Sequence, residues 1–253
     1  MSFLLGLLLC GAAFAVYFIG GADAARLLDT KALLFVTLGT IGAAFITSPM
    51  QTLFRDLACI AKLLRKKAKT EQLIGQIVTL VKAARREGVL SLEGHENEIG
   101  EPILKKGIVL LTGSADRETV EDILVKDSQY SSAVEKSAQE FVERIAFLSP
   151  GIGMIATLVE LAQMLYTYKG PQTLAPGVAN ALIPVVYAGL IAYLILFPLS
   201  SRVKAGSEKL RQRRELAIQG VLAIQAGEPP FVVEQRLLRF ADGQMMQPEQ
   251  DQE

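Results

Sequence analysis

The stretch IAFLSPGIGMIATLVELAQMLYTYKGPQTLAPGVANALIPVVYAGLIAYLILFPLS, residues 145–200, contains two formally charged side chains, Glu160 and Lys169. A helix needs about 20 residues to cross a hydrocarbon core of roughly 30 Å, because each residue advances it by about 1.5 Å. Lys169 divides this stretch into two runs of sufficient length, about 145–168 and 171–201. We therefore expect two membrane-spanning helices joined by a short loop.

Two earlier runs are also long enough to cross a bilayer. Residues 1–22 and 32–54 contain no charged side chain, and Pro49 lies near the end of the second run, where proline can kink or end a helix. A cleavable signal peptide is the alternative for the first run, but no basic residue precedes it and a second run follows within about ten residues. The sequence thus predicts four spans, with both termini on the same side.

The distribution of basic residues predicts the orientation. Of 26 Lys and Arg residues, the connections 23–31 and 169–175 hold three, the segment 55–144 holds 15, and the tail after residue 201 holds eight. The positive-inside rule therefore places both long segments and both termini in the cytoplasm. The predicted domains are two membrane helices in 1–54, a cytoplasmic helical domain in 55–144, two membrane helices in 145–201 and a cytoplasmic helical tail in 202–253.

The charged segments carry helical patterns. Residues 70–93 repeat apolar side chains at spacings of three and four, which predicts an amphipathic helix that Gly88 ends or bends. Its apolar stripe comprises Leu73, Ile77, Leu80, Val81 and Ala84. Ser114 or Asp116 is the expected N-cap of a later helix. Further helices are expected over 103–111, 128–144, 202–226 and 231–240, and no strand-like alternation occurs, so the predicted fold class is all-α.

Composition excludes several classes of protein. The chain has 51% apolar residues and a mean hydropathy of +0.34, with 26 basic and 26 acidic side chains. Nucleic-acid binding is not expected, because it needs an excess of basic residues. Cys10, Cys59 and His95 are too few to form a metal centre. Nucleotide-binding and hydrolase motifs are absent from the sequence, so we expect neither an enzyme nor a bound cofactor.

Several segments resemble a known family. They are SPGIGMIATLVELAQML (149–165), LFPLSSRV (196–203), GVLAIQAGEPPFVVEQRLLRF (220–240), AARREGVLSLE (83–93) and ILKKGIVLLTGSADRETVEDIL (103–124). Together they are similar to the MotA/PomA proteins, the ring-forming subunits of the bacterial flagellar stator. The resemblance implies a homopentamer in the bacterial inner membrane, around a dimer of a single-span MotB/PomB-type subunit. It also implies that ion flow, of protons or sodium, drives a ring that acts on the rotor protein FliG.

The resemblance also assigns roles to residues in the last two spans. Pro150 and Pro198 match prolines that act as hinges, although proline is also tolerated at helix ends. Thr157 matches a threonine near the ion path, whereas an isolated membrane threonine more often bonds its own backbone. Tyr187 occupies a tyrosine position of the family. Val185 and the proline before it stand where sodium-driven members carry a threonine pair, so loss of the hydroxyl that would help to replace a sodium ion's water favours protons.

Glu160 departs from the family pattern. It lies three positions after Thr157, on the same helix face, where the family usually has a small residue. A carboxyl group at membrane depth is costly, which points to a functional role. We expect an auxiliary proton or cation site near the ion path. The alternative is a snorkelling or hydrogen-bonded residue at a subunit contact.

Charged residues of the long loop match the family's rotor-binding surface. Arg85 and Arg86 match basic positions, and Glu93 and Glu96 match acidic ones, which implies contact with FliG; as isolated charges they would simply be solvated. The basic residues in 65–67 and 211–214 are expected to set the topology and to contact anionic lipid headgroups, rather than to bind a specific ligand.

The resemblance leaves open an alternative to the flagellar motor as the machine that ion flow drives. An ExbB/TolQ-type energiser of an envelope machine is the closest one, but those proteins typically have three spans and a different loop. A solute transporter would need paired broken helices or inverted repeats, which the sequence lacks.

Overall fold

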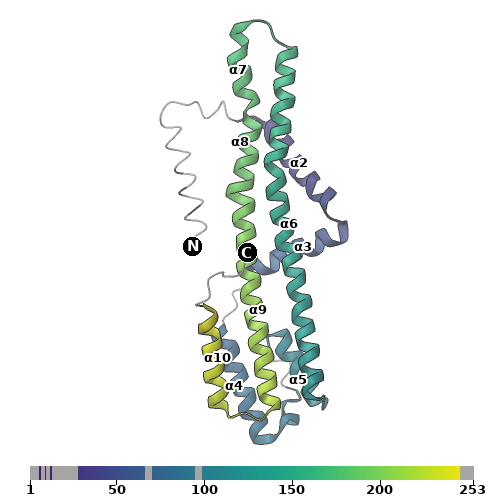
Figure 1. Cartoon of the computed structure of the whole chain (residues 1–253), viewed down its shortest axis with the longest axis vertical. Helices are drawn as coiled ribbons and strands as arrows, with labels where there is room; N and C mark the ends of the chain where they lie inside the picture. Colours follow the sequence, from purple (N-terminus) through teal and green to yellow (C-terminus); the bar gives the residue numbers. More distant parts are fainter. Residues whose placement is uncertain are drawn as a thin grey trace. The chain divides into compact units, whose positions relative to one another are not determined.

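The computed structural model describes residues 28–65, 70–94 and 99–245, together with the single positions 6, 9 and 12. All regular secondary structure in these ranges is helical, which confirms the all-α prediction for the described part of the chain (Figure 1). The predicted first span, 1–22, lies outside these ranges except for the three single positions. The chain divides into unit 1, residues 1–61 and 137–204, and unit 2, residues 62–136 and 205–253. The division falls within helices α3, α6 and α9.

Unit 1 begins, in its described part, with α2 (Thr30–Thr47). The Asp29 carboxylate caps this helix by accepting hydrogen bonds from the backbone N–H groups of Lys31 and Ala32. The helix ends at Ser48, which is extended because the following Pro49 disfavours helical geometry in the residue before it. A separate helix, α3 (Met50–Arg65), follows. The predicted run 32–54 is therefore not one helix.

The third predicted span belongs to α6 (Arg117–Tyr166), a continuous helix of 50 residues. Helical continuation from residue 128 into the span is confirmed, and the helix begins 11 residues earlier than that. Asp116 provides the cap, since its carboxylate accepts a hydrogen bond from the Thr119 N–H at 3.1 Å. Ser114 instead occupies the preceding turn with a φ of 59°.

The fourth predicted span is interrupted. It comprises α7 (Pro171–Ala181), α8 (Ile183–Leu190) and a π-helical segment, η4 (Ile191–Leu196), which leads into α9 (Phe197–Gln225). The break between α7 and α8 precedes Pro184, whose ring offers no N–H and crowds the carbonyl group four residues earlier. In η4, the Phe197 N–H bonds the Ala192 carbonyl, one residue farther back than in an α-helix.

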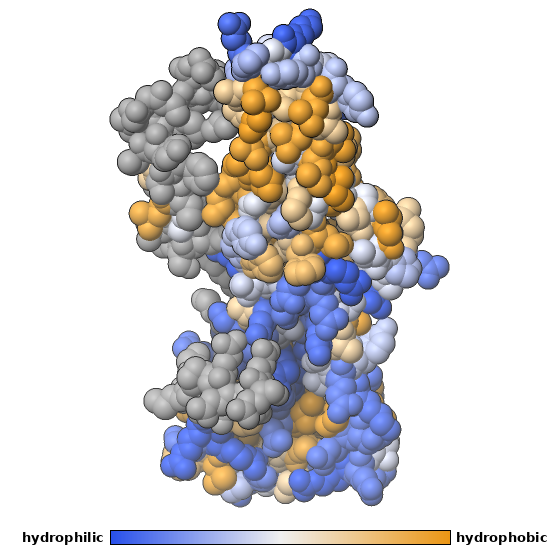
Figure 2. All heavy atoms as spheres, turned by 45° about the horizontal axis from the view of Figure 1, so that its top comes forward, coloured by the Kyte–Doolittle hydropathy of each residue, from blue (hydrophilic) through white to orange (hydrophobic). Residues whose placement is uncertain are grey.

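Within the described ranges, three segments are long and apolar enough to cross a membrane: α2, α6 and the run from α7 through α9. Figure 2 shows apolar side chains gathered in a broad band on the surface of unit 1, where α6, α7 and α8 expose many large ones. Exposed apolar surface of this kind suits lipid or a partner rather than water. The chain is accordingly a multi-pass membrane protein.

Unit 2 is a helical domain with its own apolar core. It contains α4 (Thr70–Glu87), η2 (Val89–Leu92), α5 (Pro102–Thr112), α10 (Pro230–Met245) and parts of α3, α6 and α9. The predicted stripe of α4 is buried in this core along its whole length, as expected. Gly88 ends α4 with a φ of +86°, a conformation that glycine adopts without strain. The predicted helices 103–111, 202–226 and 231–240 correspond to α5, the later part of α9, and α10.

Candidate functional site

The two helices that carry the predicted ion path pack closely against each other. A Cβ atom placed on Gly153 of α6 would overlap the Ala188 side chain of α8 and lie 3.0 Å from the Pro184 carbonyl oxygen. Such small residues allow membrane helices to approach, because lipid provides no hydrophobic gain between helices. Val185, the residue in place of the family's threonine, has its Cα 3.1 Å from the same point. Figure 1 shows α7 and α8 running alongside α6.

Thr157 lies one helical turn beyond Gly153. It is 7% exposed, and its hydroxyl finds no hydrogen-bond partner among the described residues. The hydroxyls of Thr37, Thr40 and Thr47 in α2 all bond carbonyl groups one turn earlier in their own helix. Thr157 does not follow this usual pattern, so its hydroxyl is left available within the spanning segment.

Glu160 lines a pocket of about 400 Å³. The pocket is bordered by the start of α2, the end of α6, the beginning of the next connection, and α7. Its lining comprises Asp29, Glu160, Gln163, Met164, Thr167, Thr173, Gly177, Asn180 and Ala181. The carboxylates of Asp29, which precedes α2, and of Glu160, in α6, therefore face the same polar cavity. Carboxylate, amide and hydroxyl oxygens are groups that can receive a proton or hold a hydrated cation.

Asp29 was not predicted as a site residue. Its backbone N–H donates a hydrogen bond to the Tyr187 hydroxyl oxygen at 3.3 Å, so Tyr187 of α8 holds the start of α2. The structure thus places Asp29 and Glu160 on one pocket and joins Asp29 to Tyr187. The available sequence signal was an acidic residue three positions before an apolar run, which indicates only a helix cap.

The two predicted hinge prolines, Pro150 and Pro198, lie in helices α6 and α9. Pro150 is inside α6 without ending it, and Pro198 is the second residue of α9, directly after the π-helical segment. The Ser149 hydroxyl, fully buried, donates to the Ala188 carbonyl oxygen at 3.3 Å and lies 3.4 Å from the Thr40 hydroxyl. This chain of contacts ties α2, α6 and α8 together next to Pro150. Ser149 was not predicted as a site residue.

Three of the four predicted rotor-binding residues lie on the surface of unit 2. Arg85 and Arg86 are exposed in the last turn of α4, and Glu93 is exposed directly after η2. The fourth predicted residue, Glu96, lies outside the described ranges. The intervening turn at Gly88 and the short η2 therefore separate the basic pair from Glu93.

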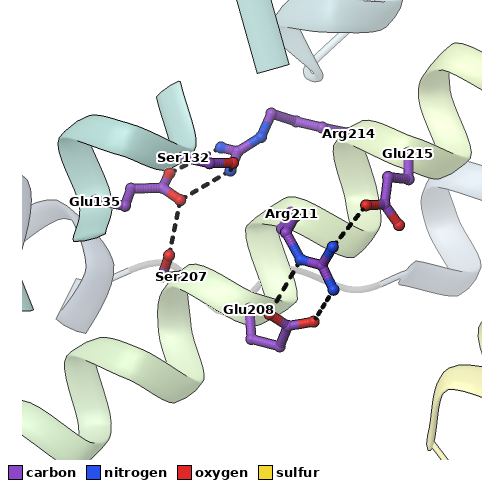
Figure 3. A network of polar contacts seen from close by, with 7 residues as sticks. All are labelled: Ser132, Glu135, Ser207, Glu208, Arg211, Arg214 and Glu215. Carbon is purple, nitrogen blue, oxygen red and sulfur yellow. Dashed lines mark hydrogen bonds and ion pairs between the residues drawn. The ribbon is translucent and has the colours of Figure 1, made fainter. Parts of the chain in front are cut away.

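The basic residues at 211–214 have partners within the chain. The buried Arg214 guanidinium contacts both Glu135 carboxylate oxygens at 2.8 Å and Ser132 at 3.0 Å, while Ser207 donates to the same carboxylate (Figure 3). Arg213 pairs with Glu101 at 3.1 Å, and both side chains are largely buried. The prediction of headgroup contacts is therefore wrong for Arg213 and Arg214. Arg211, the remaining arginine of this group, pairs with Glu208 and Glu215 of the same helix, α9.

Comparisons with known proteins agree with this architecture. The model of the MotA/TolQ/ExbB proton channel family matches residues 95–216. The chain is 30% identical over 242 residues to chemotaxis protein PomA of Vibrio alginolyticus, covering 95% of this chain and 94% of that protein. It is also 30% identical over 217 residues to the uncharacterized protein YtxD of Bacillus subtilis, covering 85% of this chain and 79% of that protein.

Solved structures show the same fold. A chain of the flagellar MotAB stator complex from Bacillus subtilis matches with a TM-score of 0.86 at 23% identity, covering 97% of this chain and 99% of that one. A chain of C. jejuni MotAB matches with a TM-score of 0.88 at 20% identity, covering 94% of each. The nearly full-length likeness to PomA places the sequence in the same family. The chain therefore belongs to the MotA/TolQ/ExbB proton channel family, in the group of PomA and motility protein A.

Proposed function

We propose that this chain is the ion-conducting stator subunit of a bacterial flagellar motor, which converts transmembrane ion flow into torque. The observation that carries the proposal is the 30% identity to PomA over nearly the full length of both chains. In this role the chain acts as a channel subunit and not as an enzyme. A charge that moves down about 100 mV releases roughly 2.3 kcal/mol, which is sufficient to bias the steps of a ring.

The arrangement of unit 1 supports an ion path along α6. Thr157 offers a hydroxyl with no partner among the described residues, and Glu160 lies one turn farther on beside Asp29 in the polar pocket. In the proposal, the Asp29–Glu160 pocket concentrates the ion at one end of this path, as an auxiliary proton or cation site. Val185 supplies no hydroxyl to replace a sodium ion's water, so the proposal favours protons.

The proposed assembly is a homopentamer around a dimer of a single-span MotB/PomB-type subunit. Its support is the fold shared with chains of MotAB stator complexes. In the proposal, the chain spans the inner membrane with both termini on the cytoplasmic side, as the positive-inside rule predicts. Unit 2 would then face the rotor, with Arg85, Arg86, Glu93 and Glu96 directed to FliG. Pro150 and Pro198 would act as the hinges between ion binding and this surface.

Rotation of tethered cells tests the proposal. The chain and its partner are expressed in a host without its own stator, sodium is varied at fixed pH, and an uncoupler is then added. Rotation that ignores sodium and stops with the uncoupler is expected. Rotation that follows sodium would overturn the preference for protons. An assembled complex that produces no rotation would contradict the flagellar role and favour the ExbB/TolQ-type alternative in the same family.

Glu160→Gln in the same assay tests the pocket. We expect lower torque with a changed pH dependence, because the amide cannot take up a proton. Gln163→Ala is the matched control, since it changes another pocket side chain without removing a carboxylate. Unchanged torque and pH dependence in Glu160→Gln would remove Glu160 from the ion path.

A further inference from the structure

The π-helical segment η4 leaves a backbone carbonyl group of the fourth span without its helical donors. In an α-helix, the Tyr193 carbonyl oxygen would accept a hydrogen bond from the Phe197 N–H, four residues later. That N–H instead bonds the Ala192 carbonyl. A π-helical bond to Tyr193 would need an N–H at residue 198, which is proline and has none. Neither helical donor is therefore available to the Tyr193 carbonyl.

The two serine hydroxyls at the start of α9 are engaged elsewhere. Ser200 donates to the Glu143 carboxylate at 3.0 Å, and Ser201 donates to the Phe197 carbonyl oxygen at 3.1 Å. These hydroxyls therefore do not replace the donor that the Tyr193 carbonyl has lost. Its oxygen can accept a hydrogen bond from water or from another chain.

The Tyr193 carbonyl lies at membrane depth. It belongs to the apolar run from α7 through α9, and the first charged residue that follows it, Arg202, is nine positions later. At 1.5 Å per residue, this separation is about 13 Å along the helix. Acyl chains offer no hydrogen-bond donor, so irregular backbone at this depth occurs only inside protein or beside a water-filled cavity.

Contacts with α6 place the carbonyl along the length of the span. The Ser149 hydroxyl of α6 bonds the Ala188 carbonyl, and Glu143, six residues earlier on α6, bonds Ser200. Tyr193 lies between Ala188 and Ser200 in the chain. Its carbonyl is therefore level with the part of α6 between residues 143 and 149, toward the end of the span where the charged segments begin.

The side of η4 that carries Tyr193 is not covered by α6. Ala188 and Ala192 are fully buried, whereas Tyr193 is 63% exposed and its ring stacks on Phe197 with 5.6 Å between ring centroids. Helical carbonyl groups point along the axis toward the residue four positions later, which here is Phe197. The oxygen therefore emerges beside the stacked rings, on a side of the helix where water can reach it only through a path inside the assembly.

We propose that the Tyr193 carbonyl oxygen binds a water molecule of the ion path, between the Thr157 hydroxyl and the cytoplasm. A carbonyl that accepts a hydrogen bond from water fixes the orientation of that water, which allows a proton to pass along a chain of waters. Pro198 then has a chemical role besides bending, because it withholds the N–H that would occupy the oxygen. The inference rests on the proposed ion-conducting function and adds to it a site formed by the backbone.

Two replacements at position 198 separate the missing N–H from the proline ring. Pro198→Leu introduces an N–H, whereas α-hydroxyisocaproic acid at this position has the leucine side chain and an ester oxygen in place of the N–H. The complex with the MotB/PomB-type partner is reconstituted in vesicles, and a pH-sensitive dye reports proton uptake driven by a potassium diffusion potential. We expect the hydroxy acid to keep uptake within about twofold of the unsubstituted complex and Pro198→Leu to lower it about tenfold, because a hydrogen bond then occupies the oxygen.

Three outcomes would contradict the expectation in different ways. Equal losses in both variants would show that the ring is required and would overturn the role of the carbonyl. Full uptake by Pro198→Leu would overturn it as well, since an occupied oxygen would conduct as well as an unoccupied one. An unsubstituted complex that transports no ions would contradict the proposed function instead, and the carbonyl is then tested by a measurement that needs no transport.

Isotope-edited infrared spectroscopy provides that measurement, also for the case in which Pro198→Leu fails to assemble. The six tyrosines of the chain are labelled with carbon-13 at the carbonyl carbon. The difference between the labelled complex and labelled Tyr193→Phe isolates the band of the Tyr193 carbonyl, and phenylalanine keeps the ring that stacks on Phe197. We expect the frequency of a water-bonded carbonyl and a shift in heavy water. A band at the higher frequency of an unbonded carbonyl, unmoved by heavy water, would overturn the water site.

Discussion

At the residue scale, Gly153 decides how closely α6 and α8 approach. A side chain there would overlap Ala188 and press on the backbone at Pro184 and Val185, which cannot yield as the end of a flexible side chain can. Gly151, two residues earlier on α6, has no atom within 4 Å of a Cβ placed on it. The same helix therefore offers a crowded glycine and an open one.

This contrast predicts different results for two identical substitutions. Gly151→Ala should be tolerated, because alanine favours a helix over glycine by about 1 kcal/mol. Gly153→Ala should separate α6 from α8 and reduce both the yield of assembled complex and the swimming speed. Size-exclusion chromatography and motility of the two variants measure the effect. Equal tolerance of both would show that the Gly153 contact does not control assembly.

Asp116 is a second residue whose effect can be isolated. Hydrogen bonds from the Thr119 side chain and backbone lower the pKa of its carboxyl group below the ordinary value of 3.8. A lowered folded-state pKa means that the cap stabilises the helix above pH 3.8 and that this contribution is lost as the pH falls through the folded pKa.

Hydrogen exchange at the first turn of α6 measures this pH dependence. We expect the wild-type turn to lose protection as the pH falls below 3.8, because protonation weakens the carboxylate as an acceptor. Asp116→Asn keeps an acceptor that does not titrate, so the protection of the variant's first turn should stay constant over the same range. A pH-dependent loss in Asp116→Asn would assign the effect to other groups.

At the scale of elements, the Glu135–Arg214 pair fastens α6 to α9 inside unit 2. Both side chains are less than 10% exposed, and the pair has two 2.8 Å contacts with hydroxyl support from Ser132 and Ser207 (Figure 3). Together with Glu101–Arg213, it gives α9 charged contacts to α6 and to the residue preceding α5. Buried pairs of this kind favour one arrangement of helices, because a lone buried charge is costly.

Removal of one partner should therefore be more harmful than removal of both. Glu135→Leu leaves the Arg214 charge buried and should destabilise the protein by about 3–5 kcal/mol, whereas Glu135→Leu with Arg214→Met should recover much of that loss. Asp122→Asn, which breaks the exposed Lys126–Asp122 pair, should cost less than about 1 kcal/mol. Thermal unfolding of the purified complex compares the three. A double variant as unstable as the single one would show that the charges themselves are required.

At the scale of the whole molecule, torque in the proposed stator would depend on the surface of unit 2 as well as on the ion path. Arg85 and Arg86 are exposed at the end of α4, where complementary charges can steer a partner without strong affinity. In the proposed stator this partner is FliG. Charge complementarity should then be visible as compensation between the two proteins.

Charge reversal tests this contact. Arg85→Glu should lower the torque without abolishing it, because exposed pairs contribute less than about 1 kcal/mol each. An opposite reversal on the rotor should restore part of the torque, and Lys82→Glu, an exposed position one turn earlier on α4, is the control. Tethered-cell rotation gives the measurement. Unaltered motility after reversing both Arg85 and Glu93 would place the rotor contact elsewhere.

The sequence by itself determined the local structure and the class of protein. The periodic stripe of α4, a cap at Ser114 or Asp116, and the apolar runs that became α2, α6 and α7–α9 each depend on neighbours within a few turns, so spacing is sufficient to predict them. The break at Ser48–Pro49 was visible only as a proline within an apolar run. Whether such a proline kinks a helix, ends it or is absorbed, as Pro150 is in α6, depends on the packing around it.

Only the tertiary structure decided which distant residues meet. Asp29 and Glu160 face one pocket although 131 positions separate them in the sequence, and Arg214 reaches Glu135 across 79. Arg213 and Arg214 were predicted to be membrane-surface charges, because a sequence gives the number and spacing of charged residues but not their burial. Periodicity fixes which face of a helix a side chain occupies, whereas the partner on that face depends on how the chain folds back on itself.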